Sequence, residues 1–541
     1  MYQNYRMGRH VFLLLFFLIL LISFTDCARR GRPEGGPKDE DAPIMVTAKP
    51  PHFTKNFNAR EIKIYFDEYI KLKDLQTQLI VSPPLKYQPI IAPQGIPSKY
   101  ISIKILDTLK GNTTYTFNFG QSVVDNNEGN VLRNFKYVFS TGDVIDSLEI
   151  SGMVKDAFQR KADDNITIML YEINEQFNDS AIYKEKPYYV GSTLDTTMWQ
   201  ITNIKAGKYM LIALKDANRN YLFNPKSDKI GYLNQPVIIP DDSIVALNLF
   251  KEEIPFKLDR ASEVAKGHLL VGFEGQHDSL QIKPLGETTD FEGMYLFEKG
   301  KDSLDYWFKG NVADSLFLNV FTDKVSDTAF VKFRTKNIDS LQVGTSTRGT
   351  LNLRDKLKLT GSIPLVAIDT NKVSFIDGDS INVKYLPKII ATSDEAAIQL
   401  DFDKKVNSKY KITLYPDALT DFFGNTNRDT LNYNLSTKSP ADYGNLYLTL
   451  QNVKAYPVIV ELLTEKGELI EQIYATEPRS FDFVNLSPDK YVVRIIYDEN
   501  KNGKWDTGNF LLRLQPEKVV YYPEVIEVRA NWDKTETFIL E

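Results

Sequence analysis

The pattern of hydrophobic and polar positions predicts short β-strands along most of the chain. Ile62, Ile64 and Phe66 alternate with polar neighbours, which is typical of a strand that buries one face. Clusters of Gly, Asn, Asp and Pro, such as Asp125–Asn130, interrupt these runs and predict turns. About 100 residues of this pattern predict an immunoglobulin-like (Ig-like) sandwich at 42–143.

The same succession of patterns occurs twice. In a second unit, at 147–250, a strand pattern runs into a polar loop that begins at Asp216. Further on, a turn at Asp421 is similar to the one at Asp125, and a loop at Asp498 is similar to the one at Asp216. The shared order predicts a duplicated pair of domains. The alternative is that β proteins reuse similar turns, because Asp, Asn and Gly suit them.

Two resemblances suggest the folds. The strand Ile62–Ile70, the run that starts at Tyr115 and the exit Phe139–Gly142 resemble the bacterial Ig-like domain of S-layer and exported proteins. The second unit opens at Ile150–Ala157 and continues to the strand Tyr209–Lys215. It resembles the small transthyretin-like or carboxypeptidase-regulatory-like sandwich. That resemblance implies an accessory or binding module rather than a catalytic one.

An apolar run near the N-terminus predicts export. It extends from Val11 to Phe24, follows Arg6 and Arg9, and ends shortly before Cys27, the only cysteine. The run is shorter than the roughly 18 residues of a spanning helix, and its flanks are typical of a secretory signal peptide. Cys27 indicates a lipoprotein signal, in which fatty acyl chains such as palmitate anchor the cleaved protein. The alternatives are an ordinary signal peptide with a bystander cysteine and an uncleaved anchor. Asp26 departs from the small residue that lipoprotein signals prefer before the cysteine.

The start of the mature chain also resembles a family of Bacteroidota Ig-like lipoproteins. Gly and Pro are frequent between 31 and 51, which predicts a tether without helix or sheet. In Bacteroidota lipoproteins, an acidic cluster just after the cysteine is associated with surface display, whereas Arg29, Arg30 and Arg32 follow Cys27 here. By that resemblance we expect the protein on the outer membrane, held by lipid and facing the periplasm rather than the cell surface.

These patterns predict an all-β, multidomain chain. Its segment 252–345 is assigned from strand patterns alone, such as Leu269–Phe273 and Ser315–Phe321. The predicted segments are a lipoprotein signal peptide (1–26), a flexible tether (27–41), a bacterial Ig-like domain (42–143), a transthyretin-like domain (147–250), a β-sandwich of unknown type (252–345), a second Ig-like domain (350–438) and a second transthyretin-like domain (442–541).

Composition narrows the functional classes. A chain of 541 residues is too long for one core, and its 12% aromatic content, with 29 Tyr and 32 Phe, favours strands. The net charge of −6 argues against a dedicated nucleic-acid binder, which would carry a basic face. A single cysteine permits no intrachain disulfide, so packing must supply the stability.

The loop after the strand at 492–497 has the spacing of a calcium site. Asp498, Asn500, Asn502 and Asp506 occupy positions 1, 3, 5 and 9 of an EF-hand-type loop, and Lys504 offers its backbone carbonyl. Asn509 stands where the bidentate Glu is usual, so we expect weak Ca²⁺ binding at most. The alternative is a polar hairpin turn held by Asx hydrogen bonds. The earlier copy at Asp216 has Tyr221 in place of the glycine.

The sequence contains no recognisable catalytic motif. It has no Gly-x-Ser-x-Gly, no phosphate-binding Gly-Lys-Ser/Thr loop and no dinucleotide fingerprint. His268 and His277, the latter beside Asp278, are nine residues apart and form at most a fragment of a general-base site. We therefore do not expect an enzyme.

The predicted function is that of a non-catalytic outer-membrane lipoprotein. We expect a scaffold or adaptor that binds other cell-envelope proteins, because serial β domains offer edge strands for strand addition. The alternative is a glycan- or peptidoglycan-binding envelope lipoprotein. Its candidate aromatic platform comprises Tyr188, Tyr189, Trp505, Tyr521 and Tyr522, although core or interface packing is the favoured explanation for these residues. Apart from weak Ca²⁺, no cofactor is expected.

Overall fold

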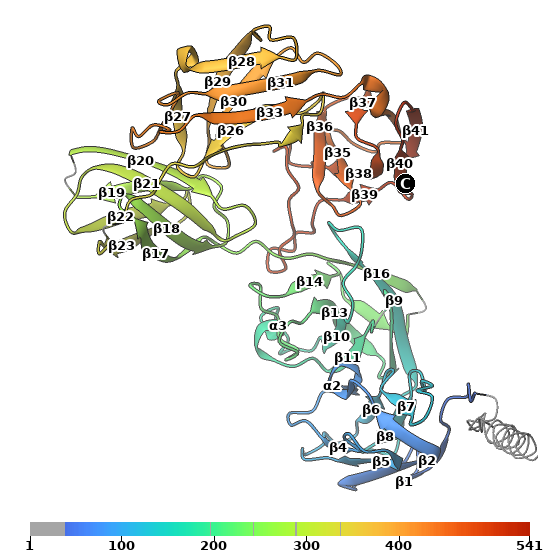
Figure 1. Ribbon diagram of the computed structural model, residues 1–541. Helices are drawn as coiled ribbons and strands as arrows, with labels where there is room; N and C mark the ends of the chain where they lie inside the picture. Colours follow the sequence, from blue (N-terminus) through green and yellow to red (C-terminus); the bar gives the residue numbers. More distant parts are fainter. Residues whose placement is uncertain (1–37, 195, 242, 287–288, 336, 541) are drawn as a thin grey trace, which may run out of the picture. The chain divides into compact units, whose positions relative to one another are not determined.

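The structure is a computed structural model that describes residues 38–194, 196–241, 243–286, 289–335 and 337–540 (Figure 1). The predicted signal peptide, Cys27 and most of the predicted tether lie outside these residues. The described chain is nearly all β-strand, which confirms the all-β, multidomain fold class. In this part of the chain no helix has the length and apolar character needed to cross a membrane.

By their internal contacts the described residues form two compact units. The first comprises residues up to 81 together with 85–145, and the second comprises 82–84 together with 146–540. Hydrophobic cores follow one another along the chain, each enclosed by its own sheets. We number the bodies around them sandwich 1 (45–140), sandwich 2 (148–249), sandwich 3 (257–332), sandwich 4 (343–436) and sandwich 5 (444–539).

Sandwich 1 packs a sheet of order β1-β2-β5-β4, in which β7 also pairs with β2, against a sheet of order β3-β6-β8. Ile62, Ile64 and Phe66 lie in its core, as their alternation predicts. Its elements are β1 (Met45–Lys49), β2 (Glu61–Leu72), α2 (Leu75–Gln78), β3 (Ile80–Ser82), β4 (Ile90–Ala92), β5 (Ser98–Lys104), β6 (Thr114–Asn118), β7 (Val123–Asp125) and β8 (Lys136–Ser140).

Sandwich 2 combines a sheet of order β11-β10-β13-β14, with β15 also on β13, and a sheet of order β12-β9-β16. The last strand, β16, pairs with the first strand, β9, in parallel. Its elements are β9 (Leu148–Asp156), β10 (Thr167–Glu172), α3 (Ala181–Lys184), β11 (Tyr189–Ser192), β12 (Met198–Ile204), β13 (Gly207–Lys215), β14 (Lys229–Tyr232), β15 (Val237–Ile239) and β16 (Ile244–Leu249).

Sandwich 5 repeats this topology strand by strand. One sheet has the order β36-β35-β38-β39 with β40 on β38, and the other has the order β37-β34-β41 with β41 parallel to β34. Its strands are β34 (Gly444–Gln451), β35 (Val458–Thr464), β36 (Leu469–Ala475), β37 (Ser480–Leu486), β38 (Asp489–Tyr497), β39 (Val519–Tyr521), β40 (Ile526–Val528) and β41 (Asp533–Ile539).

Sandwich 4 arranges β26-β30-β29 and β28-β31-β33 as sandwich 1 arranges β2-β5-β4 and β3-β6-β8. The topologies therefore recur in the order of the sequence patterns. The elements of sandwich 4 are β24 (Val343–Thr345), β25 (Gly349–Thr350), β26 (Leu357–Gly361), β27 (Leu365–Ile368), η1 (Thr370–Lys372), β28 (Val373–Asp377), β29 (Tyr385–Ala391), β30 (Ala396–Phe402), β31 (Lys409–Leu414), β32 (Leu419–Asp421) and β33 (Leu431–Ser436), and η2 (Pro440–Asp442) follows them.

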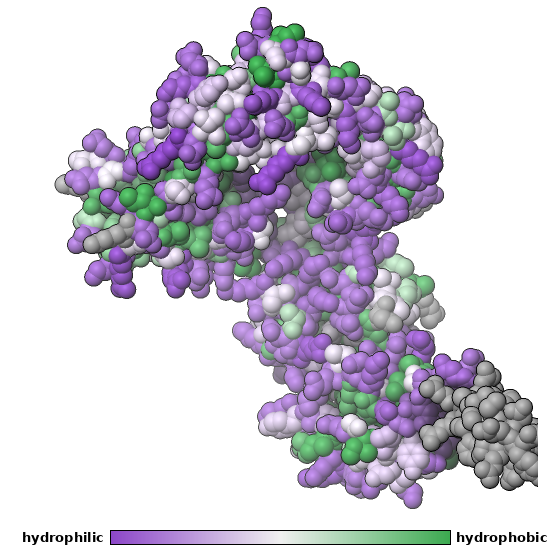
Figure 2. Space-filling model, viewed as in Figure 1, coloured by the Kyte–Doolittle hydropathy of each residue, from purple (hydrophilic) through white to green (hydrophobic). Residues whose placement is uncertain are grey.

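Sandwich 3 differs from the other four in topology. A sheet of order β17-β18-β21-β20 faces a sheet of order β19-β22-β23. Over all sandwiches the surface in view is mostly hydrophilic, with smaller hydrophobic groups between (Figure 2). The strands of sandwich 3 are β17 (Lys257–Ala265), β18 (His268–Glu274), β19 (Gln281–Leu285), β20 (Thr289–Phe297), β21 (Ser303–Asn311), β22 (Ser315–Phe321) and β23 (Ser326–Lys332).

Candidate functional site

The Asp498 loop, residues 498–518, leaves the end of β38 and is the site that the sequence singled out. Asp498 is buried, and its two carboxylate oxygens accept hydrogen bonds from the backbone N–H groups of Asn502, at 3.1 Å, and Gly503, at 2.8 Å. Gly503 has a φ of +80°, a conformation that glycine adopts without steric cost. The turn is therefore organised around one buried carboxylate.

The other predicted calcium ligands are also hydrogen-bonded within the loop. Oδ2 of Asp506 accepts the side-chain N–H groups of Asn500, at 2.8 Å, and Asn502, at 2.6 Å. Lys504 lies in the same turn, and its N–H donates to Oδ1 of Asn502 at 2.9 Å. The structure thus brings the five predicted residues into one loop with amide N–H groups, rather than amide oxygens, turned toward Asp506. Calcium binding stays a prediction.

A second carboxylate closes the loop at its base. Glu517 is buried and accepts the backbone N–H groups of Glu499, at 2.7 Å, and Asp506, at 3.0 Å. Burial raises the pKa of Glu517, although these backbone hydrogen bonds oppose the effect. Trp505 donates its indole N–H to the carbonyl of Glu517 at 3.0 Å. Sequence reasoning missed Glu517, because only the fold brings it beside the start of the loop.

The tip of the loop contacts sandwich 2 within the second unit. Phe510 is fully buried, and its ring meets that of Tyr232 edge-on, with centroids 5.1 Å apart. The Tyr232 hydroxyl donates to the carbonyls of Asn509 and Leu514, at 3.0 and 2.8 Å. A Cβ on Gly508 would come within 2.7 Å of the Phe250 ring, so the approach requires glycine. The loop is therefore an interdomain contact.

A second set of contacts joins the body of sandwich 5 to the turn after β9. The guanidinium of Arg494 lies 3.9 Å from the centre of the Phe158 ring, and its Nε donates to Glu461 at 2.6 Å. The Tyr521 hydroxyl donates to the carbonyl of Phe158 at 2.7 Å. Arg494 and Glu461 are both buried and compensate each other's charge within sandwich 5, and the Phe158 ring covers the guanidinium from sandwich 2.

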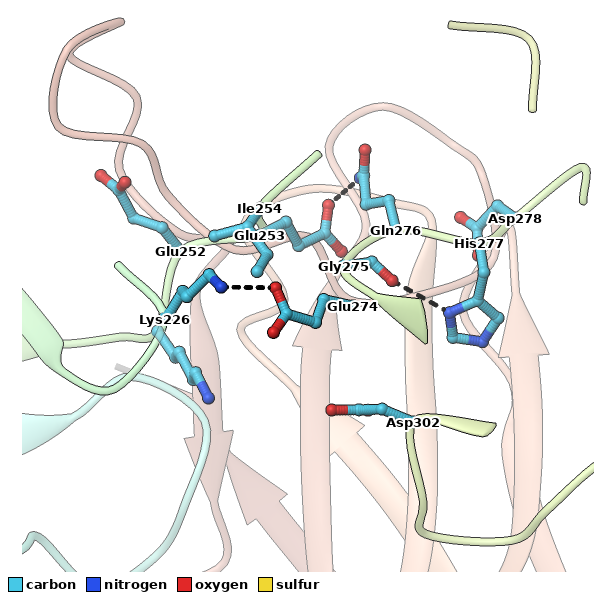
Figure 3. Close-up of a pocket in the computed structure, with 11 residues that line it drawn as sticks. Lys226, Glu252, Glu253, Ile254, Glu274, Gly275, Gln276, His277, Asp278 and Asp302 are labelled. Atoms are coloured by element: carbon cyan, nitrogen blue, oxygen red, sulfur yellow. Dashed lines mark hydrogen bonds and ion pairs between the residues drawn. The ribbon is translucent and has the colours of Figure 1, made fainter. Parts of the chain in front are cut away.

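A cavity of about 330 Å³ lies beside the docked loop (Figure 3). It is lined by the connection 251–254, the turn 274–278 after β18, and side chains that include Lys226 and Asp302. Figure 3 shows Lys226 reaching Glu274, and the two side chains form an ion pair of 2.6 Å that lowers the pKa of Glu274. The lining is therefore a network of charged groups.

Three further contacts use up polar groups around this cavity. Glu253 accepts from the side-chain amide of Gln276, and His277 Nδ1 lies 3.1 Å from the carbonyl of Gly275 (Figure 3). Glu252 is buried and accepts the N–H of Phe510, so it belongs to the loop contact. No lining residue carries a hydroxyl or thiol, so the cavity provides ion pairs but no side-chain nucleophile of those kinds.

The structure places the two histidines that the sequence singled out in different surroundings. His268 is buried, and its ring nitrogens contact Asp305 at 2.8 Å and Asp339 at 2.6 Å. Burial alone lowers the pKa of His268, but the two aspartates outweigh it and raise this pKa above its ordinary value. The His277 ring instead packs against Phe297, with centroids 4.5 Å apart.

The aromatic residues named as a candidate platform are used in packing. Tyr189 is buried in the core of sandwich 2, and the hydroxyl of Tyr522 donates to Glu536 at 2.7 Å. Trp505 packs on Phe158, with ring centroids 4.5 Å apart. Together with the Tyr521 contact described above, these positions are explained by cores and by the interdomain contact.

Comparison with known families identifies one part of the chain. Residues 39–141 match the model of the bacterial Ig-like domain. This confirms the predicted resemblance for sandwich 1. No curated protein matches the chain.

Solved structures similar to the chain include other serial β proteins. Domains 5–6 of the S-layer protein SbsC match with 12% identity over 35% of this chain and 98% of that one, at a TM-score of 0.17. Domains 1–6 of the same S-layer protein match with 11% identity over 87% and 67%, at 0.14. An I-band fragment of titin matches with 8% identity over 54% and 100%, at 0.12. At these TM-scores none of the matches bears on function.

Proposed function

We propose that the chain is a non-catalytic scaffold of the cell envelope that binds other envelope proteins. The observation that carries the proposal is the contact of Phe510 with Tyr232, by which the Asp498 loop of sandwich 5 packs on sandwich 2. Such a contact fixes one sandwich against another, and a scaffold requires fixed contacts between its domains. The bacterial Ig-like match at 39–141 is consistent with an exported protein of this kind.

We further propose that the scaffold is an outer-membrane lipoprotein, anchored through acylated Cys27 and facing the periplasm. The signal-peptide pattern supports the anchor, and the arginines after Cys27 support the periplasmic face. Several acyl chains bind a membrane stably, whereas one chain binds only marginally.

The anchor is tested by fractionating native cells that produce the wild-type chain or the Cys27→Ser variant. The wild type is expected in the outer-membrane fraction and the variant in the soluble periplasm or unprocessed in the inner membrane. External protease added to intact cells should leave the wild type uncut. Cleavage in intact cells would refute the periplasmic face, and equal membrane retention of both chains would refute the lipid anchor.

The scaffold role is tested by purifying the tagged full chain from native membranes in mild detergent and identifying what accompanies it. We expect an envelope protein in stoichiometric amount. The Phe510→Ala variant should lose this partner or bind it less tightly, while Leu512→Ala, on the same loop but 68% exposed, should retain it. A wild-type chain that purifies alone contradicts the proposal.

A further inference from the structure

The outer face of sheet β19-β22-β23 in sandwich 3 carries a row of large apolar side chains. Leu285 pairs with Phe317, and Phe317 pairs with Phe330, so the three residues stand side by side across the strands. Their side chains are 45%, 48% and 53% exposed. The residues that precede and follow each phenylalanine along its strand are buried instead. An antiparallel sheet with one face on the core normally presents polar residues on the other face. We call this row the aromatic row.

The two rings form a continuous platform. Their centroids lie 4.7 Å apart, with planes inclined by 38°. In the view of Figure 2, hydrophobic side chains gather on the part of the surface where Figure 1 places β19, β22 and β23. A cross-strand aromatic pair stabilises a sheet, but threonine or valine pairs do so without exposing two phenylalanines.

Polar and basic side chains flank the aromatic row on the same face. Lys283, Asn319 and Thr328 form the next row along the strands, and Lys332 stands opposite Ser315 on the other side. Within the described part of the chain, neither lysine forms an ion pair. The Lys283 ammonium instead lies 5.4 Å from the centre of the Phe321 ring.

The charge of this face differs from that of the whole chain. The outward positions of β19, β22 and β23 include two lysines and no carboxylate, whereas the chain has 71 acidic and 65 basic residues. The face therefore combines aromatic rings, neutral hydrogen-bonding groups and positive charge. A sugar ring presents a flat C–H face edged by hydroxyls, which fits aromatic rings surrounded by such groups. A uronic-acid or other carboxylate-bearing sugar also complements the lysines.

We propose that the outer face of sheet β19-β22-β23 binds an acidic polysaccharide, with sugar rings stacked on Phe317 and Phe330 and sugar carboxylates held by Lys283 and Lys332. Asn319 and Thr328 are placed to bond the hydroxyls. This goes beyond the scaffold role, because a scaffold without saccharide affinity would still bind its protein partner. An acidic polypeptide without aromatic or proline residues, such as poly-glutamate, shares the charge but lacks a ring face to stack on the phenylalanines.

The test is affinity electrophoresis of the full-length chain in detergent, through gels that contain polygalacturonate, dextran or poly-glutamate. Polygalacturonate is expected to retard the chain, and dextran and poly-glutamate to retard it at least tenfold less at equal concentration. Phe317→Thr/Phe330→Thr and Lys283→Gln/Lys332→Gln are each expected to weaken the polygalacturonate affinity at least tenfold. The lysine variant should also reduce its dependence on salt.

The matched control removes exposed apolar side chains elsewhere. Leu386→Thr/Ile389→Thr lies on β29 of sandwich 4, where the two residues are 75% and 48% exposed, and should bind as the wild type does. Thermal melting checks that each variant is folded. If the phenylalanine variant is unfolded, the affinity of the lysine variant for polygalacturonate tests the proposal. Equal retardation by poly-glutamate, no retardation by polygalacturonate, or unchanged affinity in folded variants would overturn the proposal.

Discussion

Asp498 holds the turn of the Asp498 loop through two backbone N–H groups, so removing its carboxylate takes the acceptor from Gly503 and one of two acceptors from Asn502. A buried polar group without a partner costs about 1–3 kcal/mol. We expect Asp498→Ala to lower the free energy of unfolding by about that amount, measured by denaturant titration with tryptophan fluorescence. The control is Glu465→Ala, an exposed position in the β35–β36 turn. Equal stability of both variants would show that the carboxylate is dispensable.

Calcium binding at the same loop would require a change in the side chains that face Asp506. Asn500 and Asn502 would have to rotate their amides, so that oxygens replace the N–H groups that now face Asp506. With only two carboxylates the affinity would be weak. Isothermal titration of the full chain with millimolar CaCl₂ is predicted to release or absorb heat, and Asp506→Asn to abolish it. The absence of heat with the wild type would exclude the site.

His268 links stability to pH. Its two ring nitrogens both contact carboxylates, so both ion pairs form only when the ring is protonated. Since the pKa of His268 is raised in the folded chain, its contribution to stability is fully present below the unfolded pKa of 6.5 and is lost as the pH rises through the folded pKa.

The expected result is therefore an acid-side stabilisation that His268→Gln removes. Melting temperatures of the two chains should differ most below pH 6 and converge at alkaline pH. His277→Gln, whose ring has no carboxylate partner among the described residues, serves as the control and should follow the wild type. A constant difference between wild type and His268→Gln at every pH would refute the ion-pair interpretation.

At the scale of elements, the tip of the Asp498 loop carries a buried side chain and an exposed one two residues apart. Phe510 is fully buried against sandwich 2, whereas Leu512 is 68% exposed. Truncating a buried Phe to Ala costs about 3–5 kcal/mol, which is enough to release a loop. We expect trypsin to cleave after Arg513 at least tenfold faster in Phe510→Ala than in the wild type. In Leu512→Ala the cleavage rate should equal that of the wild type. Similar rates in all three chains would mean that the contact does not hold the loop.

The elements also show what the sequence can and cannot predict. Alternation at Ile62–Phe66 predicts a strand because successive side chains on a strand point to opposite faces. The local sequence alone therefore indicates which of these side chains are buried. The repeated turns at Asp125 and Asp421 have the same local origin. The partners of Phe510 and His268 lie far away in the sequence, at Tyr232 and Asp339, and only the packing of whole sandwiches brings them together.

At the scale of the whole molecule, sandwiches 2 and 5 place their first strand between two later strands. In sandwich 5, β34 pairs on one side with β37 and on the other with β41, in parallel. Deleting residues 533–540 would leave one edge of β34 unpaired, and an unpaired edge promotes association between chains. We expect this deletion to produce aggregates in size-exclusion chromatography, whereas a soluble monomer with native melting behaviour would contradict the prediction.

For a chain exported from its N-terminus, as we propose for this one, the same parallel pairing sets the order in which the sandwiches fold. A sandwich whose opening strand waits for its closing strand remains incomplete until nearly all of its residues have emerged. Sandwich 1 can fold early, whereas sandwich 5 must wait for β41, and the contact of Phe510 with Tyr232 then joins sandwich 5 to sandwich 2, which is complete earlier. Until sandwich 5 has folded, the surface of sandwich 2 around Tyr232 lacks the loop that covers it and is accessible to chaperones.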